Sequence, residues 1–229
     1  PLISIVVPVY RTPEIFLREM IESVMNQTYA NWELCIADAS PIGAKMKEDL
    51  AKTKGKKKRE AILAIPDQET ELTRIIREYQ GKDARIRYEI LKENKSIAEN
   101  TNAALEMATG DFAGLLDHDD LLEPNALFEV AEKILQDDRV DAVYTDEDKI
   151  NSKGNKHLTP NMKPDFNLDL LRSNNYICHL FVVRRILISK VGGFRKEFDG
   201  AQDYDFIFRC IEAADKIAHV HKVLYHWRT

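Results

Sequence analysis

Ile3-Ser-Ile-Val-Val7 and Trp32-Glu-Leu-Cys-Ile-Ala37 are two largely apolar runs on either side of a segment with helical periodicity. Such runs are typical of strands that are buried on both faces of a parallel sheet. Thr12-Pro-Glu14 predicts the start of the helix, with Thr12 as its cap and Pro13 at the first helical position. The helix then presents one apolar stripe, which consists of Leu17, Met20, Ile21 and Val24. This β-α-β opening predicts a parallel sheet that binds its ligands at the carboxyl ends of the strands.

The rest of the chain alternates predicted strands with predicted helices. Strands are expected at residues 85–90, 112–116, 140–144 and 217–227, and helices at residues 70–79, after Ser96 and after Pro124. Ser96-Ile-Ala-Glu99 has the pattern of a capping box, and Gly110 predicts the end of the helix that this box begins. Polar residues follow the strands. We therefore expect an α/β fold.

The composition is that of a globular protein, with 44% hydrophobic and 31% charged residues. The formal net charge of −5 gives no indication of nucleic-acid binding, so we expect no nucleic-acid partner. Cys35, Cys178 and Cys210 are too widely spaced for a disulfide framework or a zinc site and favour a reducing, cytoplasmic compartment. We expect no membrane span and no signal peptide. The sequence opens inside a predicted strand and stops abruptly at Thr229, which is consistent with a domain of a longer protein.

Residues 41–66 interrupt the alternation and form a basic insertion. Between Lys45 and Arg59 the chain has eight basic residues and two acidic ones. Charge blocks of this kind are usually solvated surface segments, which is the first interpretation. The second is a patch that binds an anionic lipid or a phosphorylated acceptor, which would place the domain at the inner face of a membrane as a peripheral protein.

Two acidic clusters follow predicted strands. Asp117-His-Asp-Asp120 comes directly after the apolar run Phe112-Ala-Gly-Leu-Leu116, so Asp117 and Asp119 could both reach one divalent cation. Mg²⁺ and Mn²⁺ prefer oxygen ligands and neutralise the charge of a departing diphosphate. An acidic turn that precedes a helix is the alternative. Asp146-Glu-Asp148 either faces the same cleft or, as we favour, borders a loop.

The C-terminal part of the chain carries further candidate functional side chains. Asp203 and Asp205 lie at the start of a segment with a helical apolar stripe. A carboxylate at that place is stabilised by the helix dipole, and it could also serve as a general base for an incoming hydroxyl group. A single histidine is more often structural than a ligand. Of His219, His221 and His226, the last is the best candidate for a metal or diphosphate contact.

The motifs of the chain occur in the order that is typical of a known family. The matching pieces are Ile3-Ser-Ile-Val-Val-Pro-Val-Tyr10, Ser23-Val-Met-Asn-Gln-Thr28, Asp38-Ala-Ser40, Asn94-Lys-Ser-Ile-Ala98, Asn102, Ala108-Thr-Gly-Asp111, Asp117-His-Asp-Asp120, Tyr144-Thr-Asp-Glu-Asp148, Gly192-Gly-Phe194, Gly200-Ala-Gln-Asp-Tyr-Asp205 and Leu224-Tyr-His-Trp-Arg228. The chain resembles the GT-A glycosyltransferases of family 2, especially the bacterial members that build O-antigen, capsule and other surface polysaccharides. The resemblance covers nearly the whole chain outside the insertion, and the ordered set is much more specific than any one motif.

The resemblance implies a GT-A fold and a role for each matching residue. It implies one domain over residues 1–229, with a Rossmann-like nucleotide-sugar-binding half at residues 1–120, an acceptor-binding half at residues 121–229, and a mixed, mainly parallel sheet flanked by helices. Asp117 and Asp119 match the Asp-x-Asp signature, with Asp119 as the surer metal ligand, and Asp203 matches the catalytic base. Asp117 also matches a nucleotide-binding position, and the other residues that match such positions are Pro8, Tyr10, Asp38, Asn94, Ser96 and Asn102.

The chain departs from the family pattern at three positions. Ala37 stands where the family often has a first acidic residue, so contact with the nucleotide base depends on Asp38 alone. Ser96 replaces a usual glycine and leaves the backbone less free. Gln202 replaces a glutamate that is frequent beside the catalytic base, here Asp203. This change affects contacts to the leaving group or the acceptor.

We therefore expect an inverting, metal-dependent glycosyltransferase. Asp203 would deprotonate a hydroxyl of a glycan or lipid-linked acceptor, while Mn²⁺ or Mg²⁺ on Asp119 stabilises the diphosphate that leaves a UDP- or dTDP-sugar. One alternative is a non-catalytic sugar-nucleotide- or glycan-binding module of a larger synthase, which would have no need of a base at Asp203. The other is a nucleotidyltransferase, but we find no Gly-rich phosphate loop near the first strand.

Overall fold

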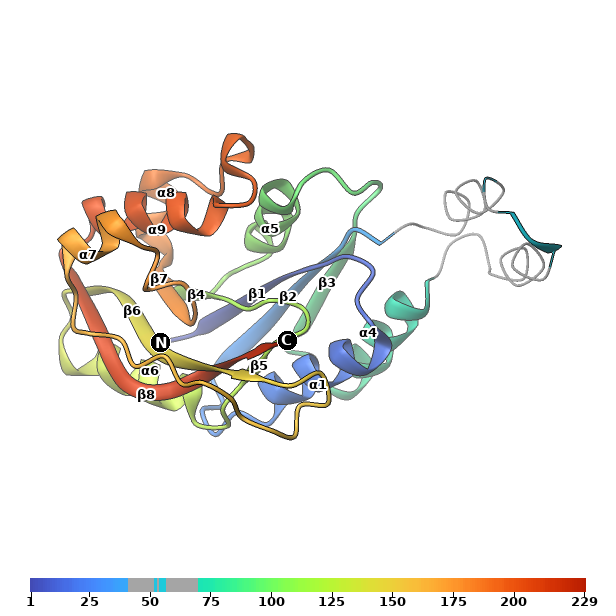
Figure 1. Ribbon diagram of the computed structural model, residues 1–229, viewed down its shortest axis with the longest axis horizontal. Coiled ribbons are helices and arrows are strands. Elements are labelled where there is room, and N and C mark those ends of the chain that lie inside the picture. Colours follow the sequence, from blue (N-terminus) through green and yellow to red (C-terminus); the bar gives the residue numbers. More distant parts are fainter. Residues whose placement is uncertain (41–51, 53, 57–69) are drawn as a thin grey trace.

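The computed structural model describes residues 1–40, 52, 54–56 and 70–229, which form helices around one curled sheet (Figure 1). The elements follow one another in this order: β1 (Ile3–Val9), α1 (Glu14–Met25), β2 (Trp32–Asp38), α4 (Glu71–Lys82), β3 (Ile86–Ile90), α5 (Ile97–Glu106), β4 (Phe112–Leu115), β5 (Leu121–Leu122), α6 (Ala126–Gln136), β6 (Val140–Ile150), α7 (Leu168–Ser173), β7 (Phe181–Arg184), α8 (Arg185–Val191), η1 (Lys196–Phe198), α9 (Gln202–Ala213) and β8 (Lys216–Arg228). The expected α/β class is confirmed.

In the described part of the chain, eight strands form the sheet in the order β3-β2-β1-β4-β7-β6-β8-β5. Strands β3, β2, β1 and β4 pair in parallel, as the β-α-β opening predicted. Strand β7 is antiparallel to both of its neighbours, β4 and β6, whereas β6 and β8 are parallel. The short β5 pairs antiparallel with the end of β8. The sheet is therefore mixed and mainly parallel, and it continues without a break through residues 1–120 and 121–229.

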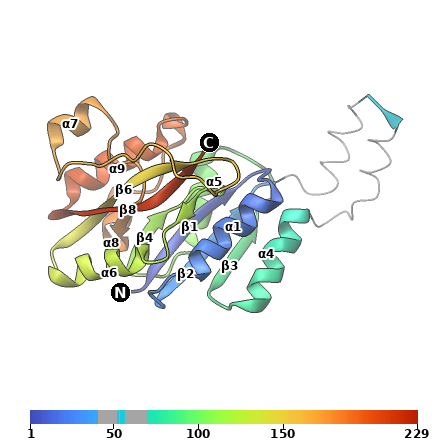
Figure 2. The same ribbon diagram turned by 60° about the horizontal axis from the view of Figure 1, so that its bottom comes forward.

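Helices cover both faces of this sheet (Figures 1 and 2). Helices α1, α4 and α6 pack on one face over a core that includes Ile5 and Leu34. Helices α5, α8 and α9 pack on the other face over a core that includes Val6 and Phe181. Alternate residues of a strand point to opposite faces, so neighbouring residues of β1 enter different cores. This double burial explains why β1 reads as a continuous apolar run.

Side-chain caps were predicted at the starts of two helices, α5 and α1. The Ser96 hydroxyl accepts a hydrogen bond from the Glu99 amide at 3.2 Å, so the predicted cap of α5 is confirmed. The predicted cap at Thr12 is wrong, because α1 begins after Pro13 with no side-chain cap. The Thr12 hydroxyl is instead buried, with no hydrogen-bond partner among the described residues.

Gly110 does not end α5, which stops at Glu106. A Cβ at Gly110 would come within 2.6 Å of both the Leu2 carbonyl oxygen and the Ser4 hydroxyl oxygen. The glycine therefore allows the start of β4 to pass close to β1, which the helix-end prediction did not anticipate.

The second half of the chain contains elements that the sequence did not indicate. The strand predicted at residues 140–144 continues to Ile150, through the whole of the second acidic cluster. It does so because β8 pairs with β6 along its entire length, from Val140 to Ile150. Strand β7 and helices α7 and α8 were also not predicted.

The basic insertion at residues 41–66 lies outside the described residues, apart from Lys52 and residues 54–56, so both interpretations of it stay predictions. Among the described residues, no helix is long and apolar enough to cross a membrane.

Candidate active site

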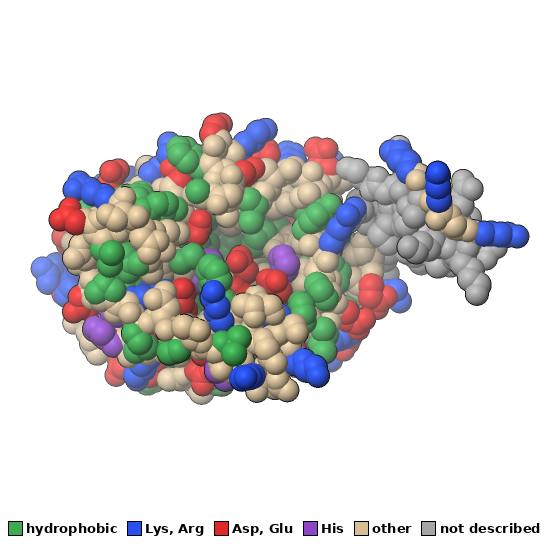
Figure 3. Space-filling model, in the orientation of Figure 1, with side chains coloured by type: hydrophobic (Ala, Val, Ile, Leu, Met, Phe, Trp, Pro, Cys, Tyr) green, Lys and Arg blue, Asp and Glu red, His purple; other side chains and the backbone are tan. Residues whose placement is uncertain are grey.

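Two adjoining hollows lie over the carboxyl ends of β1 and β4. The first hollow, of about 320 Å³, reaches to Tyr10 and Asp119, and the second, of about 220 Å³, reaches to Asp203. They share Pro8, Ile97 and Asp117, so they form one groove. Acidic side chains and histidine gather around the hollowed middle of the face in Figure 3.

The loop that follows β4 is held by the last residues of β8. The Tyr225 hydroxyl accepts a hydrogen bond from the Asp117 amide at 3.2 Å and donates one to Asp120 Oδ2 at 2.7 Å. Arg228 donates from its amide to Asp120 Oδ1 at 2.8 Å and from Nε to the Asp119 carbonyl at 2.6 Å. The sequence reasoning gave Tyr225 and Arg228 no role, although their motif was recognised.

These contacts engage Asp120 and the backbone, and the carboxylates of Asp117 and Asp119 remain open to the groove. Their side chains are 49% and 38% exposed. Burial, together with the charge of Asp117, raises the pKa of Asp120 to about 7. Two open carboxylates in such an acidic loop, with room beside them for water and phosphate oxygens, fit the donor set that Mn²⁺ and Mg²⁺ prefer.

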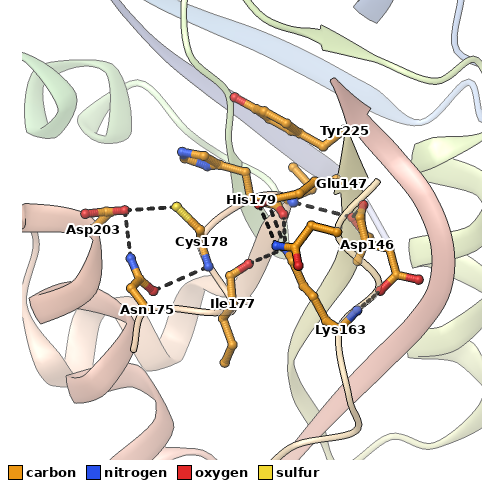
Figure 4. Close-up of polar contacts among 12 residues, drawn as sticks. Asp146, Glu147, Lys163, Asn175, Ile177, Cys178, His179, Asp203 and Tyr225 are labelled. Carbon is orange, nitrogen blue, oxygen red and sulfur yellow. Dashed lines mark hydrogen bonds and ion pairs between the residues drawn. The ribbon is translucent and has the colours of Figure 1, made fainter. Parts of the chain in front are cut away.

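Asp203 lies in the first turn of α9 and lines the second hollow. Its Oδ2 accepts a hydrogen bond from Asn175 Nδ2 at 3.1 Å and lies 3.5 Å from Cys178 Sγ (Figure 4). Burial, and after it the charge of Asp203, raises the pKa of the Cys178 thiol, so the thiol keeps its proton and can act as a weak hydrogen-bond donor. These two contacts orient the Asp203 carboxylate beside the hollow.

Asp205 has a different environment from Asp203. Its carboxylate accepts hydrogen bonds from Arg195 Nε at 3.0 Å and from Arg209 Nη2 at 2.9 Å. Arg209 also donates to the Gly193 carbonyl at 2.7 Å, so the ion pair ties α9 to the loop after α8. Asp205 is therefore a structural residue of this corner.

Four of the predicted nucleotide-binding residues line the first hollow together with Asp117 and Asp119. They are Pro8, Tyr10, Asn94 and Ser96. The Asn94 side chain is held by Asn100, whose Nδ2 donates to Asn94 Oδ1 at 2.7 Å. The structure thus brings together residues from β1, from the β3–α5 loop and from the end of β4.

Asp38 and Asn102 line neither hollow. The Asp38 carboxylate is fully buried at the end of β2, where it accepts hydrogen bonds from the Ser40 amide at 2.9 Å and the Thr73 hydroxyl at 3.4 Å. Burial raises the pKa of Asp38. Asn102 donates to the Phe194 carbonyl and accepts from the Phe194 amide, both at 2.8 Å, so its amide fixes the loop after α8.

His226 does not lie with Asp117 and Asp119, contrary to the expectation that it shares their metal. It points to the opposite face of β8 from Trp227, which lines the second hollow, because alternate residues of a strand face opposite sides. Its Nδ1 lies 2.6 Å from Asp148 Oδ1, and its Nε2 lies 2.9 Å from Glu123 Oε2.

The second acidic cluster neither faces the groove as a unit nor borders a loop, because it lies within β6. Asp146 accepts a hydrogen bond from the Lys163 amide at 2.8 Å and pairs with His219. Glu147 pairs with the buried ammonium group of Lys163 at 3.0 Å. Lys163 also donates to the carbonyls of Ile177 and His179, and so supports the segment that carries Cys178 (Figure 4).

The segment from Asn175 to His179 is a part of the site that the sequence reasoning missed. His179 lines the second hollow, and its Nε2 lies 3.6 Å from Asp117 Oδ2. Its ring stacks on Tyr225, with centroids 4.8 Å apart. In the sequence this segment is marked only by polar residues at 173–175 and by the apolar run at residues 180–183, which are weak evidence of a functional site.

Residues 4–43 and 45–192 match the family described as glycosyl transferase family 2. The chain belongs to this family. Over its full length this family 2 domain is 42% identical to the uncharacterized protein y4gI of Sinorhizobium fredii and 38% identical to the O-antigen biosynthesis protein RfbC of Myxococcus xanthus. It is 27% identical, over 99% of its length, to a chondroitin synthase of Pasteurella multocida. The chain spans 22%, 16% and 20% of the lengths of these relatives.

Solved structures share the fold of this family 2 domain. Residues 1–349 of Staphylococcus aureus TarS in complex with UDP superimpose with a TM-score of 0.74 at 17% identity, over all of this chain and 61% of that fragment. The mannosyltransferase PcManGT of Pyrobaculum calidifontis, in complex with GDP-Man and Mn²⁺, has a TM-score of 0.65 at 17% identity, over 99% of this chain and 56% of that protein. The domain has the GT-A fold, and its family identifies it as a glycosyltransferase, as the order of the motifs predicted.

Proposed function

We propose that this domain catalyses an inverting, metal-dependent transfer of a sugar from a nucleoside-diphosphate sugar to a hydroxyl group of a glycan or lipid-linked acceptor. The observation that carries the proposal is that Asp203 and the Asp117–Asp119 pair line one groove. In a single displacement the attacking oxygen and the leaving diphosphate lie on opposite sides of the anomeric carbon. A base and a cation-binding pair at two parts of one groove suit this geometry.

The nucleotide of the donor occupies the first hollow in this proposal. Pro8 and Tyr10 flank the nucleoside, and Asn94 and Ser96 border it on the side of α5. Asp38 would contact the base only if its carboxylate exchanged its present partners, the Ser40 amide and the Thr73 hydroxyl, for the nucleotide. Residues 1–120 would thus bind the donor, and residues 121–229 would supply the acceptor side.

Asp119, with Asp117 beside it, would hold the Mn²⁺ or Mg²⁺ ion. When bound there, the ion neutralises the charge that develops on the departing diphosphate. Tyr225 and Arg228 position the loop that carries both carboxylates, and they do so through the backbone and Asp120. The structure therefore separates the side chains that would bind the ion from those that shape the loop.

Asp203 removes the proton from the acceptor hydroxyl. The hydroxyl oxygen forms a bond to the anomeric carbon while the bond from that carbon to the diphosphate oxygen breaks, and the nucleoside diphosphate leaves with the electron pair. The anomeric configuration inverts, and no covalent intermediate with the enzyme forms. Asn175 and Cys178 keep the Asp203 carboxylate directed at the hollow during this step.

The related proteins support the choice of donor and acceptor classes. TarS has been solved with UDP and with UDP-GlcNAc, and PcManGT with GDP-Man and Mn²⁺. Relatives in sequence carry the names O-antigen biosynthesis protein and chondroitin synthase. We therefore favour a UDP- or dTDP-sugar as donor and a growing bacterial surface polysaccharide as acceptor.

Product analysis tests the proposal. Purified protein is incubated with a panel of sugar nucleotides, Mn²⁺ and glycan acceptors, after a thermal-shift screen has selected the donors that raise the melting temperature. A glycosyltransferase releases nucleoside diphosphate and forms a glycoside of inverted anomeric configuration. In a parallel incubation with nucleoside triphosphates and sugar 1-phosphates, release of pyrophosphate would instead identify a nucleotidyltransferase, and binding with no product in either reaction would identify a non-catalytic module of a larger synthase.

A further inference from the structure

We propose that His219, His221 and Asp165 form a binding site for one zinc-class divalent ion, separate from the groove. One ligand atom from each residue lies within 4.8 Å of the other two. Asp165 Oδ1 lies 3.5 Å from His219 Nδ1 and 3.0 Å from His221 Nε2. Tetrahedral zinc ligands at ordinary bond lengths are about 3.3 Å apart, so these atoms are already close to the spacing of a coordinated set.

The strongest indication of a ligand is a buried nitrogen that lacks a partner. The His219 side chain is 1% exposed, and among the described residues its Nδ1 has no hydrogen-bond partner. A buried polar atom without a partner loses its hydrogen bond to water and gains none in return, so such atoms are uncommon unless a ligand satisfies them. His219 Nδ1 lies 3.5 Å from Asp165 Oδ1 but forms no hydrogen bond to it.

The other ring nitrogen of His219 sets the tautomer. Its Nε2 lies 2.9 Å from Asp146 Oδ1, which also accepts the Lys163 amide hydrogen at 2.8 Å. Asp146 Oδ1 is therefore an acceptor, His219 Nε2 carries the hydrogen, and Nδ1 presents a lone pair. Burial lowers the pKa of His219, which favours this neutral ring. A carboxylate that holds the far nitrogen of a histidine is the usual support of a metal-binding imidazole.

The rest of the site is also held in place. The Tyr144 ring stacks on His219, with centroids 4.5 Å apart. The Tyr144 hydroxyl donates to the Pro164 carbonyl at 2.6 Å, and the Lys163 amide is bound to Asp146, so the two residues before Asp165 are both fixed. The ring of His221 lies 4.1 Å from that of His219, measured between centroids. Only small movements of Asp165 and His221, both at the surface, would complete the coordination.

The ligand set favours zinc over the ions that suit the groove. Two imidazole nitrogens and one carboxylate oxygen are typical of Zn²⁺, whereas Mg²⁺ prefers oxygen ligands throughout. Asp165 is 80% exposed and His221 is 61% exposed, which leaves room for water at a fourth position. The loop with Asp165 also contains Lys163, which supports the carbonyls of Ile177 and His179, so bound zinc would stiffen the wall of the second hollow.

A second group of histidine and carboxylate side chains supplies a control. Asp148, His157 and His226 also lie close together, but both ring nitrogens of His226 and Nδ1 of His157 already have carboxylate partners. His226 contacts Asp148 and Glu123, and His157 Nδ1 lies 2.8 Å from Asp148 Oδ2. Because this cluster is satisfied without an ion, removing His157 should leave zinc binding unchanged.

The test measures zinc binding to the whole chain in an Asp119→Asn background, which removes the expected groove ion. Protein freed of metal with EDTA is titrated with ZnCl₂ and followed by equilibrium dialysis and thermal unfolding. We expect one equivalent of Zn²⁺ to bind and, at about 100 times Kd, to raise the melting temperature by about 5–10 °C. Asp165→Ala and His221→Ala should each weaken binding at least tenfold, and His157→Ala should bind as the background does.

Asp165 and His221 are surface residues, so their variants should keep the metal-free melting temperature of the background, which shows that they fold. The proposal is overturned if the background binds no zinc, or if both variants bind zinc as tightly as the background. It is also overturned if His157→Ala alone abolishes binding, because the ion would then occupy the other cluster.

Discussion

The two acidic stretches, Asp117-His-Asp-Asp120 and Asp146-Glu-Asp148, look alike in sequence, since each follows an apolar strand run. In the structure the first stretch forms a loop that turns two half-exposed carboxylates toward the groove. The second stretch lies within β6, and each of its carboxylates pairs with a histidine or lysine side chain. Asp146 pairs with His219, Glu147 with Lys163, and Asp148 with His226.

The difference between the stretches comes from strand pairing. Strand β4 ends at Leu115, so the residues after it are free to turn toward the groove. Strand β6 keeps its partner β8 through Ile150, with register shifts on either side of Asp146, so the second stretch stays in the sheet and does not turn toward the groove. In this domain the acidic stretch that leaves the sheet is therefore the one whose carboxylates reach the groove. The same contrast, between a carboxylate at a hollow and one bound by basic side chains, separates Asp203 from Asp205.

The largest expected effect is that of replacing Asp203 on the rate of sugar transfer. We expect Asp203→Asn to lower the rate of sugar transfer by roughly 10²–10⁴, because a positioned general base contributes about that factor. Donor affinity should be unchanged, since Asp203 contacts no part of the nucleotide in the proposed step. Transfer is measured as nucleoside diphosphate release, and donor affinity by calorimetry.

Asp205→Asn is the matched control, because Asp205 pairs with Arg195 and Arg209 and lines neither hollow. This variant should lose stability but keep most of its transfer rate per folded molecule. If Asp203→Asn transferred sugar at a rate near that of the wild type, Asp203 would not be the base.

The second effect concerns the metal. We expect Asp119→Ala to weaken the Mn²⁺-dependent binding of UDP by roughly 10–100-fold, a range typical of losses around a metal site. Its melting temperature should change little, because the Asp119 carboxylate is 38% exposed. Calorimetry of UDP with and without Mn²⁺ measures the affinity. Equal affinity with and without the ion in both proteins would refute a metal at this loop.

The third prediction is a loss of stability with no loss of UDP affinity, the opposite of what is expected for Asp119→Ala. We expect Asp146→Ala to lower the free energy of unfolding by about 1–3 kcal/mol, because it leaves His219 Nε2 and the Lys163 amide without an acceptor in a buried place. The Mn²⁺-dependent affinity for UDP should stay near the wild-type value. Urea denaturation in EDTA measures the stability. Asp146→Asn, which keeps an acceptor oxygen, should lose less, and a stronger effect on UDP than on unfolding would contradict the assignment.

The smallest expected effect is on the fold when the basic insertion is replaced. A short Gly/Ser linker in place of residues 44–60 should leave the melting temperature nearly unchanged, because the segment has little apolar content to bury. Binding to vesicles that contain anionic lipid should fall, if the basic run contacts a membrane surface. A large loss of stability would show that the segment is part of the fold.

Much of the first half could be predicted from sequence because its signals are local. The run at Ile3 predicted β1, since a strand buried on both faces needs apolar side chains in both directions. Ser96 predicted the start of α5, since a cap depends only on residues three positions apart. Asp117 and Asp119 could be assigned to the groove because they follow directly after β4.

The sequence by itself thus determined the fold class, the family and the open carboxylates at the end of β4. Tertiary structure decided which face His226 occupies, that Thr73 binds the Asp38 carboxylate, and that Asn102 holds the Phe194 loop. It also decided that β7 enters the sheet antiparallel between β4 and β6. These outcomes depend on pairings between residues far apart in the chain, and such pairings leave no periodic signal in either segment alone. The environment of the His219 ring has the same origin, because Asp146 next to its Nε2 comes from β6 and Asp165 near its Nδ1 comes from the loop before α7.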